Sequence, residues 1–231
     1  KNSSKNWMYR VYNRRFFNYL SDLSGIGFFT ALQSLKVNEC NRLTALDLSQ
    51  NTALQRLETR WCTGLTALDL SHNTELTYLD CQQCGSIAAL DLSANTKLHQ
   101  VVCHSNNMSS LIMPSTSTTL QYITCYINQL RGSAMNTFIN SLPDVSSSSE
   151  EHVIYIIDDD ATEDNMISTA QVQAANAKGW NVWNALAEEY TGTEVIAFAD
   201  PAVKAICVAN YDPDGDGELT KDEVAADGNA D

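Results

Sequence analysis

The stretch Leu43-Thr-Ala-Leu-Asp-Leu-Ser-Gln-Asn-Thr-Ala-Leu54 decides the fold, because it recurs twice at a spacing of 22 residues. It returns as LTALDLSHNTEL over residues 65–76 and as IAALDLSANTKL over residues 87–98. A period of this length indicates a repeat architecture, in which each unit buries its apolar side chains only against its neighbours. We therefore predict an α/β protein built on a solenoid of about five coils of ~22 residues, each with a short parallel strand.

Apolar columns continue through the looser segments between these repeats. One column holds Leu32, Leu54, Leu76, Leu98 and Leu120, and the next holds Leu35, Leu57, Leu79, Val101 and Ile123. The alternation of apolar and polar residues around these positions is typical of strands. A third column contains cysteine or asparagine, side chains that can satisfy inward-facing backbone groups at a turn: Cys40, Cys62, Cys84, Asn106 and Asn128.

The pattern over residues 24–130 resembles the leucine-rich repeat, LxxLxLxxN/C, and in particular the bacterial secreted type that reads LTxLDLSxNTxLxxLxCxxN. The resemblance implies a leucine-rich-repeat solenoid and an extracellular or cell-surface location, with any signal peptide already removed. It also implies a sheet that binds a protein or glycan. We expect no membrane contact except through an anchor outside this sequence.

The cysteines admit two interpretations. Cys81-Gln-Gln-Cys84 has the spacing of a redox motif or a zinc half-site. However, both residues fall in repeat columns, and buried cysteine packs as a small apolar side chain. We favour the structural interpretation. The histidines at 72, 99 and 104 occupy unrelated repeat positions, so they do not predict a metal site.

The two strand segments of each coil carry different outward residues. One series is uniform, with Asp47, Asp69 and Asp91 each followed two residues later by serine. Stacked aspartates repel one another, so we predict that each accepts hydrogen bonds from backbone or hydroxyl groups. The other series is varied and rich in interface-type residues. It is either a recognition surface or an ordinary solvated face, and its candidate ligand-binding residues are Arg56, Arg60, Tyr78, His104, Tyr122 and Tyr126.

Both ends of the repeat look capped. The aromatic and basic segment 7–20 predicts a helical N-terminal cap within residues 1–23, with membrane-surface contact as the lesser alternative. Residues 131–192 predict an α/β C-terminal cap: a helix closed by Pro143, a strand at 153–157, a helix opened by the capping box at Ser168, and a strand at 180–183. The same residues resemble the C-terminal cap of those bacterial proteins. For the acidic loop 158–164 three interpretations remain: a solvated loop, a cation site or a pair of catalytic carboxylates.

The segment 193–231 contains the strongest chemical signal. Residues 212–223 (DPDGDGELTKDE) match the EF-hand loop, with Gly217 at the sharp turn and a helix predicted before it from Pro201. The match resembles the EF-hand superfamily, although EF-hand loops usually occur in pairs and the helix expected after this loop is short. We predict one Ca²⁺, bound with a Kd on the order of 10⁻⁴–10⁻³ M. Its ligands are Asp212, Asp214, Asp216, Glu218, Thr220 and Glu223.

Composition narrows the function. The 231 residues carry a net charge of −14, which argues against nucleic-acid binding. Residues 132–231 hold 20 acidic and three basic side chains, whereas residues 1–131 have a net charge of +3. No nucleophile–base spacing, phosphate loop or zinc motif indicates an enzyme. We expect a secreted or surface-exposed binding module, or alternatively a structural spacer whose junction calcium rigidifies.

Overall fold

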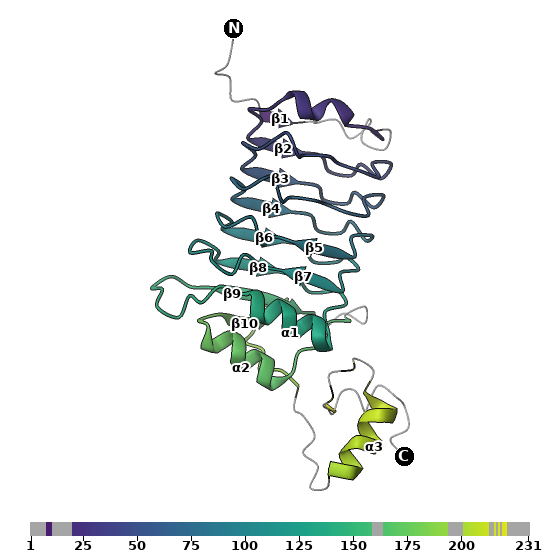
Figure 1. Ribbon diagram of the computed structural model, residues 1–231, viewed down its shortest axis with the longest axis vertical. Helices are drawn as coiled ribbons and strands as arrows, with labels where there is room; N and C mark the ends of the chain where they lie inside the picture. Colours follow the sequence, from purple (N-terminus) through teal and green to yellow (C-terminus); the bar gives the residue numbers. More distant parts are fainter. Residues whose placement is uncertain are drawn as a thin grey trace.

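The computed structural model describes residues 8–10, 20–158, 164–193, 201–212, 215, 217, 219 and 220. These residues form an α/β protein dominated by one parallel sheet of eight strands, stacked one above another along the long axis of the molecule (Figure 1). In order along the sheet, the strands are β1 Met8–Arg10, β2 Ser34–Lys36, β3 Arg56–Glu58, β4 Tyr78–Asp80, β6 Gln100–Val102, β8 Tyr122–Thr124, β9 Val153–Ile157 and β10 Asn181–Asn184.

The 22-residue period sets the strand register. Arg56 pairs with Tyr78, Tyr78 with Gln100, and Gln100 with Tyr122, so equivalent repeat positions lie side by side. In β2, β3, β4, β6 and β8 the middle residue points inward and is buried, and one residue each of β9 and β10 lies in line with these. Together these residues make one apolar column through the stack, which is the leucine-rich-repeat-like core predicted from the sequence: Leu35, Leu57, Leu79, Val101, Ile123, Ile154 and Val182.

The opposite side of each coil is less regular. Only β5 Ala89–Asp91 and β7 Ser110–Ile112 pair there, as a two-stranded parallel sheet within the described residues. Buried asparagines join the earlier coils instead. The Nδ2 of Asn73 donates to the carbonyls of Leu48 (3.1 Å) and Asn51 (3.0 Å), and Asn95 repeats this with the next coil. Each coil is therefore fastened to the one before it by the same pair of bonds.

A left-handed turn follows each strand of the repeat. Five non-glycine residues at 22-residue spacing have φ between 50° and 60°, a conformation that L-residues with bulky side chains rarely adopt. The residue after each turn then points its side chain inward, at the cysteine and asparagine column. The turn residues are Glu39, Trp61, Gln83, Ser105 and Ile127.

The prediction of an N-terminal helix is wrong for the three residues of that segment that the structure describes, residues 8–10. Met8–Arg10 is the strand β1, which pairs in parallel with β2, while residues 7 and 11–19 lie outside the described residues. An uncovered β2 would leave a row of unpaired backbone groups at the sheet edge, and a paired strand satisfies them. A 3₁₀ helix at Ser24–Phe28 opens the first coil.

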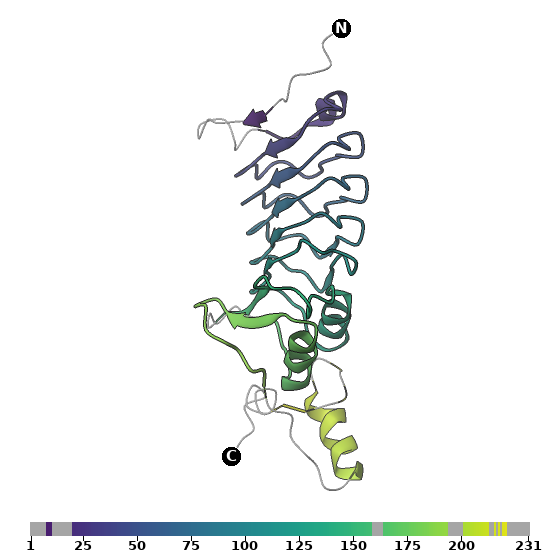
Figure 2. The same ribbon diagram turned by 90° about the vertical axis from the view of Figure 1, so that its left-hand side faces the viewer.

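The C-terminal cap follows the sequence prediction closely. Helix α1 Gly132–Ser141 packs against β7, and helix α2 Thr169–Ala177 packs against α1 and β10. Ser168 closes the predicted capping box with Gln171, and Gly179 has φ +89° just past the helix end. The parallel strands β9 and β10 join the main sheet at β8, so the α/β cap extends the sheet beyond the last repeat coil (Figure 2).

The segment beyond the cap contains one described helix, α3 Pro201–Tyr211. It begins at Pro201, where the sequence predicts the first helical residue, since proline fixes φ and lacks the N–H that has no partner at that position. Among the described residues no helix is both long and apolar enough to cross a membrane.

Candidate functional site

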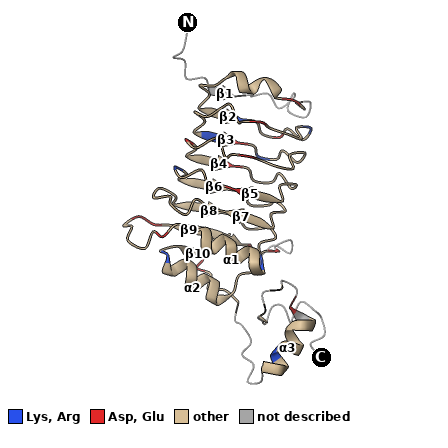
Figure 3. Cartoon of the chain, viewed as in Figure 1, with Lys and Arg blue, Asp and Glu red and all other residues tan. Residues whose placement is uncertain are grey.

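The outward side chains of the large parallel sheet form a continuous surface, here called the sheet face. Three positions per coil point outward because the residues between them are buried. In the cartoon coloured by residue charge, part of β3 is blue for a basic residue, and red acidic positions lie nearby (Figure 3). The candidate residues from the sequence all lie on this face: Arg56 and Tyr78 on β3 and β4, Tyr122 on β8, and Arg60, His104 and Tyr126 just after their strands.

Arg56, Tyr78 and Glu58 are in contact on this face. The guanidinium carbon of Arg56 lies 3.6 Å from the centroid of the Tyr78 ring, within cation–π range. Its Nε donates to Glu58 Oε1 at 2.9 Å, and Lys36 Nζ lies 2.7 Å from Glu58 Oε2. Burial alone would raise the pKa of Glu58, but the bonds from Lys36 and Arg56 outweigh it and lower the pKa overall.

Asp80 joins Arg60, Tyr78 and Gln82. Its carboxylate accepts from Arg60 Nε at 2.6 Å, from the Tyr78 hydroxyl at 3.2 Å and from Gln82 Nε2 at 3.1 Å. Only 1% of the Asp80 side chain and 8% of the Glu58 side chain are exposed, against 30% for Arg60 and 44% for Arg56. The carboxylates therefore lie beneath the cations. We call Lys36, Arg56, Glu58, Arg60, Tyr78 and Asp80 the charged cluster.

His104 and Tyr126 form a second pair, further along the sheet face. Their rings stack at 4.3 Å between centroids and 16° between planes, and His104 Nδ1 lies 2.9 Å from Ser105 Oγ. Burial lowers the pKa of His104, and the charges of Asp80 and Asp158 only partly oppose this. The imidazole is therefore neutral at pH 7.

Aromatic residues of the C-terminal cap continue the sheet face, and the sequence analysis did not include them. Tyr155 on β9 pairs with Thr124, and the ring of Trp183 on β10 meets it edge-on at 5.7 Å. Tyr122, which is 40% exposed, lies on the neighbouring strand β8. The βαβ pattern could have revealed these residues, because parallel strands of a cap add to the edge of the sheet they cover.

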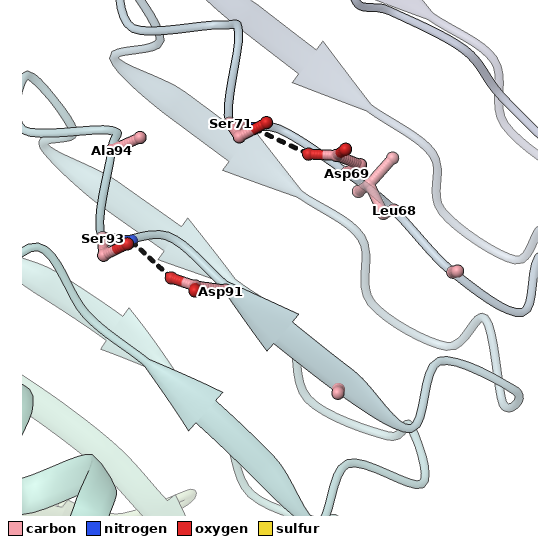
Figure 4. Close-up of a pocket in the computed structure, with 8 residues that line it drawn as sticks. Leu68, Asp69, Ser71, Asp91, Ser93 and Ala94 are labelled. Carbon is pink, nitrogen blue, oxygen red and sulfur yellow. Dashed lines mark hydrogen bonds between the residues drawn. The ribbon is translucent and has the colours of Figure 1, made fainter.

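The uniform aspartate column lies on the other side of the coils and behaves as predicted. Each carboxylate accepts from the backbone N–H of the serine two residues on, at 2.9–3.0 Å, as Figure 4 shows for Asp69 and Asp91. These bonds lower the pKa of Asp47 and Asp69. Asp69 and Asp91 line an open groove of about 480 Å³ with Ala67 and Ala89. The identical bonds in each coil mark this column as scaffold.

The repeat cysteines lie in the core. Cys81 and Cys84 are fully buried and reduced, and Cys84 Sγ donates to the Thr59 carbonyl at 2.9 Å. Burial raises the pKa of Cys81 and of Cys103, which keeps both thiols protonated. Asn106 and Asn128 follow Cys84 in its column and bond to the same inward backbone groups, as the sequence predicts.

The predicted calcium loop is described only in part. The Asp212 carboxylate accepts from the backbone N–H of Gly215 at 2.8 Å and of Gly217 at 3.0 Å, and Gly217 has φ +82°. Leu219 and Thr220 are buried. The remaining predicted ligands, Asp214, Asp216, Glu218 and Glu223, lie outside the described residues, as does most of the acidic loop 158–164.

No family model matches the sequence, and no curated protein matches it. Eight chains of solved structures match. One is the functional domain of InlJ from Listeria monocytogenes, which includes a cysteine ladder; it is 22% identical, with a TM-score of 0.38. The match covers 68% of this protein and 45% of the InlJ chain. The leucine-rich-repeat-like fold described above rests on this chain's own strand register.

Proposed function

We propose that this protein is a non-enzymatic, secreted or surface-exposed binding module that recognises a protein or glycan through the sheet face. One observation carries the proposal: side chains that vary from coil to coil contact one another on one side of the stack, while the other side repeats the same bond. Arg56 stacks on Tyr78, and His104 on Tyr126. Arginine, tyrosine and tryptophan are the residues that most often anchor interfaces.

An array of glycans and extracellular proteins tests this proposal. We expect the wild-type chain to bind a ligand that the Tyr122→Ala and Tyr78→Ala variants bind at least tenfold more weakly, since truncating an interface anchor costs about 2 kcal/mol. Asp69→Asn, on the uniform column, is the matched control and should bind as wild type. Equal binding by all variants would instead favour a structural spacer with an inert sheet face.

We further propose that the C-terminal loop binds one Ca²⁺. Asp212 stands at the first ligand position of the sequence motif, and its carboxylate accepts from the backbone N–H groups of Gly215 and Gly217. The loop supplies carboxylate and carbonyl oxygens, the ligands that Ca²⁺ prefers. Residues 212–223 are rich in Asp and Glu, so a divalent cation would reduce the repulsion among their carboxylates.

Calorimetric titration tests the calcium proposal. We expect one site with a Kd on the order of 10⁻⁴–10⁻³ M, and at least a tenfold loss of affinity in Glu223→Gln, which removes a bidentate ligand. Glu194→Gln removes the same charge outside the loop and should leave the affinity unchanged. Absence of heat at millimolar calcium would refute the proposal.

A further inference from the structure

One guanidinium of the charged cluster, that of Arg56, is held in place and still has donors that could bind a ligand. Arg56 uses Nε for Glu58 and one face of its plane for Tyr78. Within the described part of the chain, neither of its Nη atoms has a hydrogen-bond partner. The Arg56 side chain is 44% exposed, while Glu58 and Tyr78 hold its Nε and one face of its plane in place. A fixed group loses little conformational entropy when it binds.

Apart from the Tyr78 hydroxyl, the exposed polar groups of the charged cluster only donate hydrogen bonds. Both carboxylates are buried and already accept from cations, so they cannot accept from an incoming hydroxyl. What remains at the surface is the ammonium of Lys36 and the guanidinium groups of Arg56 and Arg60. A guanidinium matches a carboxylate in shape and charge, with two parallel N–H bonds. The charged cluster therefore suits an anionic ligand that only accepts hydrogen bonds.

The rings of the sheet face distinguish a peptide from a sugar chain. A sugar packs on an open aromatic face, but Arg56 covers one face of Tyr78 and His104 covers one face of Tyr126. One face of each of these rings is therefore unavailable for stacking by a sugar. The cations and the aromatic anchors lie on the same sheet: Arg56 is on β3 and Tyr122 is on β8, three strands further along.

We propose that the charged cluster binds the carboxylate side chains of an acidic segment in a partner protein, with Arg56 and Arg60 as the recognition residues. This inference rests on the proposed function and specifies the chemistry of its ligand. The segment crosses β3 and β4, and its neighbouring residues contact Tyr122 and Tyr126.

A fluorescently labelled oligo-glutamate peptide is the probe, and its anisotropy is followed against the full chain at low salt. We expect saturable, salt-sensitive binding that Arg56→Gln weakens roughly tenfold and Arg56→Lys several-fold, because lysine keeps the charge but loses the fork. Lys97→Gln is the matched control: its ammonium also pairs with a carboxylate, Glu75, and is 55% exposed. It should bind the peptide as wild type.

Three outcomes would overturn the inference: unchanged binding in Arg56→Gln, equal binding of an oligo-lysine peptide, or tighter binding of polygalacturonate, which would identify an acidic glycan instead. Circular dichroism checks the fold of Arg56→Gln, and the Arg56→Lys variant carries the test if that fold is lost. Failure here is distinguishable from failure of the proposed function. An array ligand lost in Tyr122→Ala but retained in Arg56→Gln would leave the binding module standing without its acidic partner.

Discussion

Thr59 occupies a core position that its neighbours fill with less polar groups. The equivalent residues in other coils are Val37, Cys81, Cys103 and Cys125, all buried. The Thr59 hydroxyl is also fully buried, and it has no hydrogen-bond partner among the described residues. An unsatisfied buried hydroxyl costs free energy that a methyl group of the same shape does not.

We therefore predict that Thr59→Val raises the free energy of unfolding by about 1–2 kcal/mol. Urea denaturation measures it. Thr124→Val changes the same atoms at an outward position of β8, where the exchange should alter the stability by less than about 0.5 kcal/mol. A destabilised Thr59→Val would mean that the hydroxyl has a partner in solution.

Glu58 makes the charged cluster sensitive to acid. Its folded pKa lies below the unfolded value, so its contribution to stability is complete at neutral pH and is lost as the pH falls through the folded pKa. We predict that Glu58→Gln loses about 2 kcal/mol at pH 7 but matches wild type at a pH below the folded pKa of Glu58, where both side chains are neutral. Unfolding curves at the two pH values measure this. An equal deficit at both would show that the loss comes from packing rather than charge.

At the scale of elements, the asparagine column ties consecutive coils together. The fully buried side chain of Asn73 donates hydrogen bonds to two carbonyls of the preceding coil. Asn73→Ala should lower the free energy of unfolding by about 3 kcal/mol, because two buried hydrogen bonds are lost and each carbonyl keeps only its backbone N–H donor. Thermal or urea unfolding measures the change. Ser71→Ala, two residues earlier and exposed, should stay within about 0.5 kcal/mol of wild type.

The elements that could be predicted are those with a local or periodic cause. The leucine columns repeat every 22 residues. The start of α2 at the Ser168 capping box and its end before Gly179 depend only on residues close in sequence. The strand Met8–Arg10 was not predicted, because its pairing depends on β2, which is distant in sequence. The left-handed turns escaped notice as well, since residues as different as Trp61 and Ile127 fill them.

The candidate site was predictable by position but not by interaction. Alternation along the strands places Arg56, Arg60 and Tyr78 outward, and the structure has them there. Which carboxylate each cation contacts depends on side-chain rotamers across neighbouring coils, and no spacing in the sequence encodes those. Tyr155 and Trp183 reach the sheet face only because the C-terminal cap pairs with β8.

For the whole molecule, the stack makes stability local, because each coil contacts only its neighbours. Trp180 is fully buried in the C-terminal cap, and its Nε1 donates to the Pro143 carbonyl at 2.9 Å. Trp180→Ala should cost about 3–5 kcal/mol there. In hydrogen exchange, we expect β9, β10 and α2 to lose protection while β2, β3 and β4 keep theirs. Uniform loss along the sheet would show that the stack unfolds as one unit.

The direction of the strand-to-strand bonds has a mechanical consequence. The hydrogen bonds of the main sheet join strands stacked along the long axis, so they run roughly parallel to that axis (Figure 1). A force that pulls the two ends of the stack apart loads one interface at a time rather than shearing all of them together. Each 22-residue coil that peels away releases about 75 Å of chain. Under tension between its two ends, such a protein would lengthen at low force in steps of equal length, and it would absorb load before it breaks.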